Sequence, residues 1–265
     1  MGGPGSSERV SVPLRCLTHR TRDHGRMQAT VVLVHGAWHG AWCFDRVVSR
    51  LAQAAISTIA VDLPGHGAGS GAFGDLHDDA ARVCDVLADL DGDAVLLGHS
   101  YGGAVITQAG THPAVRHLVY LCAFPLDLGE SCAAAAADEA AGLSHDRRPN
   151  LADAFVSHSD GTTTLNPDGA ARCLYNDCDP ETLRWALSQL GPHPMVTLGQ
   201  APNAVAWRER PSTYVVCTND MAVHPDLQRI LARRCTAGVE WPTSHSPFAS
   251  RPDLVAELLA ELATT

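Results

Sequence analysis

The fold of this chain is decided by the segment AVLLGHSYGG, residues 94–103. An apolar run with strand character leads to a serine that has one glycine two positions before it and another two positions after it, and the helix-compatible segment 104–109 follows at once. This G-x-S-x-G pattern between a strand and a helix is typical of a sharp turn that exposes a nucleophilic serine. A side chain at Gly98 or Gly102 would collide with the neighbouring strand or helix. We therefore expect Ser100 to lie exposed at the carboxyl edge of a sheet.

A second loop is expected to supply a backbone donor to the same place. Residues 35–42, HGAWHGAW, follow the β-branched run 30–34, which has the composition of a buried parallel strand. A glycine-bearing loop after an early strand commonly provides one oxyanion donor, and the residue after the nucleophile provides the other. The sequence thus predicts an oxyanion hole formed by the backbone N–H groups of Ala37 and Tyr101. We interpret Trp38 first as a loop-packing residue and second as a substrate contact.

Segments with strand and helix character alternate along the chain on both sides of the Ser100 turn. Strand character occurs at residues 30–34, 57–61, 94–97, 117–122, 213–218 and 238–241, and helical spacing at 43–54, 76–90, 104–109 and 252–262. This alternation predicts an α/β fold with a mostly parallel sheet, right-handed crossovers and flanking helices.

The alternation stops between residues 126 and 205, where no run has comparable strand character. Helical spacing is present at 180–190, and an interruption of this length is too long for a connecting loop. We interpret it as an inserted helical lid over a core made of residues 27–125 and 206–265. The candidate residues for lining a substrate pocket are Trp38, Phe124, Tyr175 and Trp185.

An acid and a histidine follow two of the late strands. Asp220 comes after the strand at 213–218, and His245 comes after the last strand. The order serine, acid, histidine, each in a loop after a strand, is that of the α/β-hydrolase triad, so Ser100, Asp220 and His245 are the predicted catalytic residues. Asp226 is a weaker candidate for the acid because it falls in the following helix. His99 adjoins the serine, and we interpret it as structural.

The first 26 residues differ from the rest of the chain, and the overall composition excludes several kinds of function. Residues 1–26 have no apolar periodicity and no secretory hydrophobic region, so we expect a disordered leader, with Met27 as a possible natural start. The net charge of −10 without a basic patch argues against nucleic-acid binding. The chain contains no lysine, which excludes Schiff-base chemistry. We expect no membrane association.

The cysteines indicate a reducing compartment. Their number, nine, is odd, they are scattered, and no C-x-x-C pair occurs, although Cys173 and Cys178 lie close in sequence. Several lie in apolar runs, where a free thiol packs as a small hydrophobic group. We therefore expect a cytoplasmic protein with reduced cysteines, no metal site and no cofactor.

Four motifs together resemble one branch of the α/β-hydrolase superfamily, which holds plant methylesterases, salicylate-binding esterases and hydroxynitrile lyases. They are VLVHGAWHGAW (32–42), GHSYGG (98–103), VVCTNDMAVHPDLQ (215–228) and TSHSPF (243–248), and the resemblance covers roughly residues 28–262. The insertion piece 179–190, followed by Pro192, belongs to the same resemblance and, with the loop 35–42, narrows it to this branch. The lyases of this branch carry threonine at the place of Gly36 and lysine at the place of Ser246. The resemblance therefore implies an α/β-hydrolase fold and an esterase in preference to a lyase.

The expected function is hydrolysis of a small or medium carboxylic ester through an acyl-enzyme on Ser100. Two alternatives stay open at this point. One is a biosynthetic tailoring enzyme that uses the same triad on a thioester or lactone, for hydrolysis or cyclisation. The other is a small-molecule receptor with vestigial activity. The oligomeric state, a homodimer included, is also open.

Overall fold

A six-stranded sheet forms the centre of the molecule. The computed structural model describes residues 28–69, 71–140 and 150–265, so the expected leader at 1–26 lies outside the described residues. The sheet order is β2-β1-β3-β4-β8-β9, and every neighbouring pair is parallel. The strands are β1 (Thr30–Val34), β2 (Thr58–Val61), β3 (Ala94–His99), β4 (Val115–Leu121), β8 (Ser212–Cys217) and β9 (Ala237–Trp241). The predicted parallel α/β sheet is therefore confirmed.

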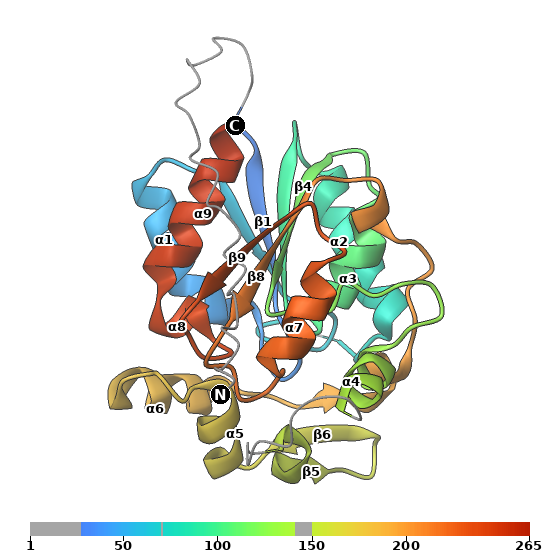
Figure 1. Cartoon of the computed structure of the whole chain (residues 1–265), viewed down its shortest axis with the longest axis vertical. Coiled ribbons are helices and arrows are strands. Elements are labelled where there is room, and N and C mark those ends of the chain that lie inside the picture. The colour runs from blue at the N-terminus through green and yellow to red at the C-terminus, as the bar shows by residue number, and fades with distance from the viewer. Residues whose placement is uncertain (1–27, 70, 141–149) are drawn as a thin grey trace, which may run out of the picture.

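Helices cover both faces of this sheet, as Figure 1 shows. One face carries α1 (Asp45–Gln53) and α9 (Pro252–Thr264), and the other carries α2 (Leu76–Ala88), α3 (Gly102–Ala109) and α7 (Pro225–Ala232). Alternate residues of β1 belong to the two separate hydrophobic cores, Val31 to one and Val32 to the other. A strand with both faces buried is apolar at every position, which explains the continuous runs in the sequence.

The turn between β3 and α3 has the steric requirement that the sequence predicts. A Cβ atom at Gly98 would lie 2.4 Å from the carbonyl oxygen of Gly102, and one at Gly102 would lie 2.6 Å from the carbonyl oxygen of His35. Both contacts are with backbone, which cannot move aside. Ser100 itself has a φ of 52°, a conformation rare for residues with a side chain. The strained strand-to-helix turn at Ser100 is thus confirmed.

The order in which the chain adds strands to the sheet reverses between β1 and β3, and the loops after these two strands lie at that point. From β1 the chain goes to β2 on one side and then returns to β3 on the other side of β1. In open α/β sheets, the loops that follow two such strands separate and leave a crevice at the carboxyl ends. The loop after β1 contains Ala37, and the loop after β3 contains Ser100.

The insertion between β4 and β8 differs in part from the predicted helical lid. It contains α4 (Cys132–Ala140), α5 (Pro167–Leu174) and α6 (Pro180–Gln189), but also an antiparallel sheet of β5 (Phe155–Ser157), β6 (Thr162–Leu165) and β7 (His193–Pro194). These strands are only two to four residues long, too short for an alternating pattern to be visible in the sequence. In Figure 1 the insertion lies at one end of the central sheet.

The remaining elements are short. They are η1 (Ala41–Phe44), η2 (Leu151–Ala154), η3 (Met195–Gly199), η4 (Ala206–Arg208) and α8 (Pro247–Ser250). Among the described residues, no helix combines the length and the hydropathy that crossing a membrane requires.

Candidate active site

The structure brings Asp220 and His245 into contact. Asp220 follows β8 and His245 follows β9, and because these strands are parallel neighbours their carboxyl ends meet at the same edge of the sheet. The Nδ1–H of His245 donates to Oδ2 of Asp220 at 2.7 Å, and both side chains are buried. This hydrogen bond keeps the ring proton on Nδ1 and leaves the lone pair of Nε2 free, which is the tautomer that a general base needs. Asp226 lies in α7 and pairs with Arg229 instead.

The Asp220 carboxylate is held on both of its oxygens. Oδ1 accepts from the backbone amides of Ala222 and Val223 at 2.7 and 2.9 Å, and Oδ2 also accepts from the side-chain amide of Gln228 at 2.8 Å. A buried carboxylate requires such partners to remain charged. The side-chain carbonyl of Gln228 accepts in turn from the Cys217 amide. No pattern in the sequence predicts this role for Gln228, and its one distinguishing feature is a polar side chain on the buried side of α7.

Ser100 is fixed by the end of β4. Its backbone amide donates to the carbonyl of Leu121 at 3.2 Å, and its own carbonyl accepts from the amides of Gly103 and Phe124 at 2.9 and 3.3 Å. Phe124, one of the pocket candidates, is therefore next to the turn, and its side chain is buried.

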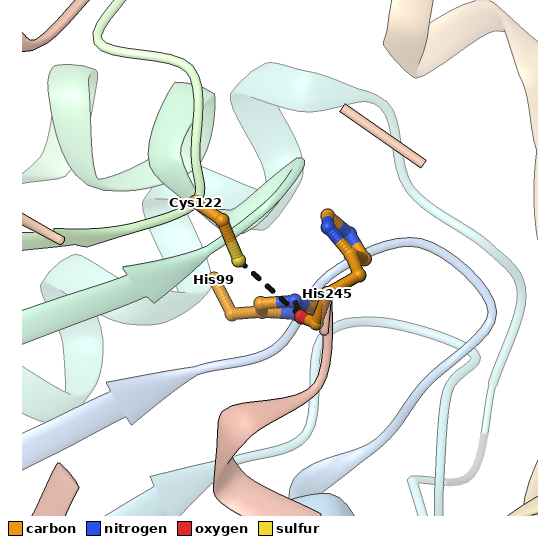
Figure 2. Close-up of side chains that lie close together, drawn as sticks. All are labelled: His99, Cys122 and His245. Carbon is orange, nitrogen blue, oxygen red and sulfur yellow. Dashed lines mark hydrogen bonds between the residues drawn. The ribbon is translucent and has the colours of Figure 1, made fainter. Parts of the chain in front are cut away.

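His99 and Cys122 hold the main chain of His245, as Figure 2 shows. Nε2–H of His99 donates to the His245 carbonyl oxygen at 2.9 Å, and the Cys122 thiol donates to the same oxygen at 3.3 Å. The rings of His99 and His245 lie 4.7 Å apart. Because His99 is adjacent to Ser100 in the chain, this contact places His245 beside the Ser100 turn. The structural interpretation of His99 agrees with this arrangement, whereas Cys122 had been given no role.

The same three residues have the composition of a metal site, since their potential ligand atoms lie within 4.8 Å of one another. Their hydrogen bonds account for the cluster in another way. The Cys122 thiol donates to a carbonyl, and a cysteine must give up that proton to bind a metal, while Nδ1 of His245 is already bonded to Asp220. Burial also raises the pKa of the Cys122 thiol far above its ordinary value, which opposes thiolate formation. The donor set therefore suits a main-chain clamp better than a cation.

The two predicted oxyanion donors are both available. Within the described residues, neither the Ala37 amide nor the Tyr101 amide donates to a protein acceptor. The described part of the chain has four non-glycine residues with positive φ, and three of them lie in the loops around this point: Trp38 (63°), Ser100 (52°) and Cys122 (40°). Strained backbone that persists in a folded protein is concentrated at functional sites.

The histidines around the site are neutral. Burial lowers the pKa of His39 to about 4, and it holds the pKa values of His35, His99 and His193 well below the ordinary range. His39 donates from Nδ1 to the Ala37 carbonyl at 2.8 Å, and its Nε2 accepts from the hydroxyl of Tyr175 at 2.7 Å. These imidazoles therefore act as hydrogen-bonding parts of the framework.

The pocket candidates have different surroundings. Trp38 is buried, with its indole N–H bonded to Thr163, and Tyr175 is buried against His39. The ring of Trp185 contacts Trp42 edge-on at 5.3 Å, and the Arg46 guanidinium lies 5.4 Å above it. The ring contacts of Trp185 within the described chain are therefore with η1 and α1, and not with Ser100, Asp220 or His245.

The sequence matches the alpha/beta hydrolase family over residues 31–258. This match spans most of the chain, and the protein therefore belongs to the α/β-hydrolase family.

Several relatives extend over nearly the whole chain. An alpha/beta hydrolase of Aspergillus novofumigatus is 29% identical over 252 residues, which is 89% of this chain and 97% of that protein. Methylesterase 7 of Arabidopsis thaliana is 26% identical over 257 residues, 89% of this chain and 96% of that protein. The crystal structure of a pyrethroid hydrolase from Sphingobium faniae is 27% identical with a TM-score of 0.75, and covers 89% of this chain and 97% of its own. The expectation of a hydrolase-class enzyme resembling the methylesterase branch is confirmed.

Proposed function

We propose that this protein is a serine ester hydrolase that forms an acyl-enzyme on Ser100. The observation that carries the proposal is the buried 2.7 Å hydrogen bond between His245 and Asp220, with His245 clamped beside the strained Ser100 turn. The relatives named as esterases and hydrolases support the same reaction class. The proposed substrate is a small or medium carboxylic ester, bound under the insertion.

The proposed reaction has two steps. His245 accepts the proton of the Ser100 hydroxyl as its oxygen attacks the ester carbonyl, and the amides of Ala37 and Tyr101 stabilise the oxyanion. One such donor typically lowers the barrier by about 2.7–4 kcal/mol. Asp220 stabilises the imidazolium, which then protonates the departing alcohol. Water, activated by His245, hydrolyses the acyl-enzyme and regenerates Ser100.

Two features of the site disfavour a cyanide-releasing reaction. A Cβ atom at Gly36 would lie 2.8 Å from Nδ1 of His99, so the larger residue found there in the resembled lyases does not fit this packing. Residue 246, directly after the histidine, is a buried serine, which supplies no cation to stabilise a leaving cyanide.

The proposal is tested by mass spectrometry after exposure to a fluorophosphonate, together with turnover of p-nitrophenyl acetate and butyrate. We expect one label on Ser100 and measurable turnover. Ser100→Ala should abolish labelling and lower kcat by a factor on the order of 10⁶. Ser49→Ala, which changes an exposed serine on α1, is the control and should behave as the unmodified protein.

Full turnover in Ser100→Ala would refute the assignment. If the unmodified protein neither labels nor turns over but binds small molecules tightly, the receptor interpretation replaces the esterase. Preference for thioesters or lactones over simple esters would indicate a tailoring enzyme on the same triad.

A further inference from the structure

The loop that carries Ala37 is joined to the insertion through Trp38. The indole N–H donates to the carbonyl oxygen and to the hydroxyl of Thr163 on β6, at 3.1 and 3.2 Å. The ring also lies 5.2 Å from that of Phe155 on β5 and 5.8 Å from that of His193 on β7. All three strands of the small sheet therefore contact this one side chain, which is only 4% exposed.

The main chain of Trp38 is held from the same side. Its carbonyl accepts from the Gly191 amide, just before β7, at 2.9 Å. Trp38 has a φ of 63°, which a bulky residue adopts only where its surroundings impose it. Relaxation of this φ to the ordinary negative range would rotate the Ala37–Trp38 peptide. The contacts with the insertion therefore fix the peptide that follows Ala37, and through the Cα atom of Ala37 they restrict the Gly36–Ala37 peptide, which carries the Ala37 N–H.

A second connection reaches the same peptide. The Ala37 carbonyl accepts from Nδ1–H of His39, whose Nε2 accepts from the hydroxyl of Tyr175 at the end of α5. A neutral imidazole has one donor and one acceptor, and this pair of bonds uses both. The insertion thus holds Ala37 on both sides, through Trp38 and through His39.

We propose that Trp38 is a positioning residue, which, by its bonds to the small sheet of the insertion, sets the orientation of the Ala37 amide in the oxyanion hole. The inference rests on the proposed function for the role of that amide. In this role the indole N–H of Trp38 is used by Thr163 and does not bind the substrate. The insertion is then part of the catalytic framework, because the oxyanion hole is complete only when the small sheet is packed against Trp38.

The test compares Trp38→Phe with Trp207→Phe in the full-length protein. Trp207 provides a matched control, since its indole N–H also donates to a backbone carbonyl, that of Leu126 at 2.9 Å, away from Ala37. We expect Trp38→Phe to lower kcat for p-nitrophenyl acetate by about tenfold with KM nearly unchanged, because an oxyanion contact acts in the transition state. The rate advantage of the ester over its thiono analogue should fall too, since the larger sulfur gains less from the donors. Trp207→Phe should change neither quantity.

A second measurement is independent of turnover. Hydrogen exchange of a peptide covering residues 35–44 should be faster in Trp38→Phe, and unchanged in Trp207→Phe, because the loop loses its attachment to the insertion. The inference would be overturned if the peptide 35–44 of Trp38→Phe exchanged at the same rate as in the unmodified protein. It would also be overturned if kcat fell while the ratio of the ester rate to the thionoester rate stayed the same. If the unmodified protein has no esterase activity, the proposed function fails, and the exchange result alone decides whether Trp38 holds the loop.

Discussion

At the scale of the residue, Asp79 on α2 is a buried carboxyl group behind the Ser100 turn. Its Oδ2 accepts from the hydroxyl of Tyr101 at 2.6 Å, while Oδ1 has no hydrogen-bond partner among the described residues. Burial raises the pKa of Asp79 from 3.8 to about 7. The group is therefore neutral in the folded protein at mildly acidic pH and becomes charged near neutrality, next to the residue whose amide we propose as an oxyanion donor.

This predicts that Asp79→Asn stabilises the protein in a pH-dependent way. Because the folded pKa lies above the ordinary value, the free energy of unfolding of the unmodified protein loses a contribution as pH rises from 3.8 through about 7. Asparagine keeps an acceptor for Tyr101 and has no charge to bury. Urea unfolding should therefore show a gain that is larger at pH 8 than at pH 5 by roughly 2–3 kcal/mol. Asp85→Asn, an exposed change on the same helix, should show none; an equal gain at both pH values would contradict the prediction.

At the scale of the element, the connection from β3 to α3 depends on the close approach of three backbone segments. A Cβ atom at position 102 would lie 2.6 Å from the carbonyl oxygens of both Val34 and His35. Gly102→Ala is therefore expected to lower the free energy of unfolding by about 3 kcal/mol or more, because the end of β1 cannot retreat without disrupting the sheet. Urea unfolding and fluorophosphonate labelling should both show the loss.

The matched control is Gly92→Ala, in the exposed turn before β3. Nothing lies within 4 Å of a Cβ atom at that position. We expect its free energy of unfolding to stay within about 0.5 kcal/mol of the unmodified value. Similar stability of the two variants would show that the Ser100 turn accepts a side chain at position 102 and would contradict the prediction.

At the scale of the whole molecule, six histidines in the described chain are held neutral by burial. The pKa values of His39 and His117 are lowered to about 4, and those of His35, His66, His99 and His193 are also lowered. The unfolded chain therefore binds more protons than the folded one below pH 6.5, so the free energy of unfolding falls as pH decreases from 6.5 to about 4. Urea unfolding at pH 7.5, 5.5 and 4.5 should show this steep loss.

The contribution of one histidine can be separated without touching the site. His117 bonds to Thr213 between β4 and β8, and His117→Gln should make the acid loss of stability shallower. His158→Gln, at an exposed position, should leave the pH dependence unchanged. Stability that is constant from pH 7.5 to 4.5 would contradict the prediction.

The sheet was predictable because its signals are local. Each central strand is apolar at successive positions, since both of its faces are covered, and the Ser100 turn is marked by glycines that sterics require. The positions of Asp220 and His245 after strands followed from the same pattern, because parallel strands bring their carboxyl ends to one edge. The small sheet of the insertion was missed, since strands of two to four residues leave no period to detect.

The parallel α/β framework, and the loops that meet at its carboxyl edge, follow from the sequence alone, because periodicity and turn sterics act over a few neighbouring residues. How those loops are held depends on the tertiary structure. It shows that Gln228 supports Asp220, that His99 and Cys122 clamp His245, and that Trp38 is bonded to Thr163, which is 125 positions away. Contacts over such separations have no local pattern, since they arise from the packing of elements that the sequence specifies one at a time.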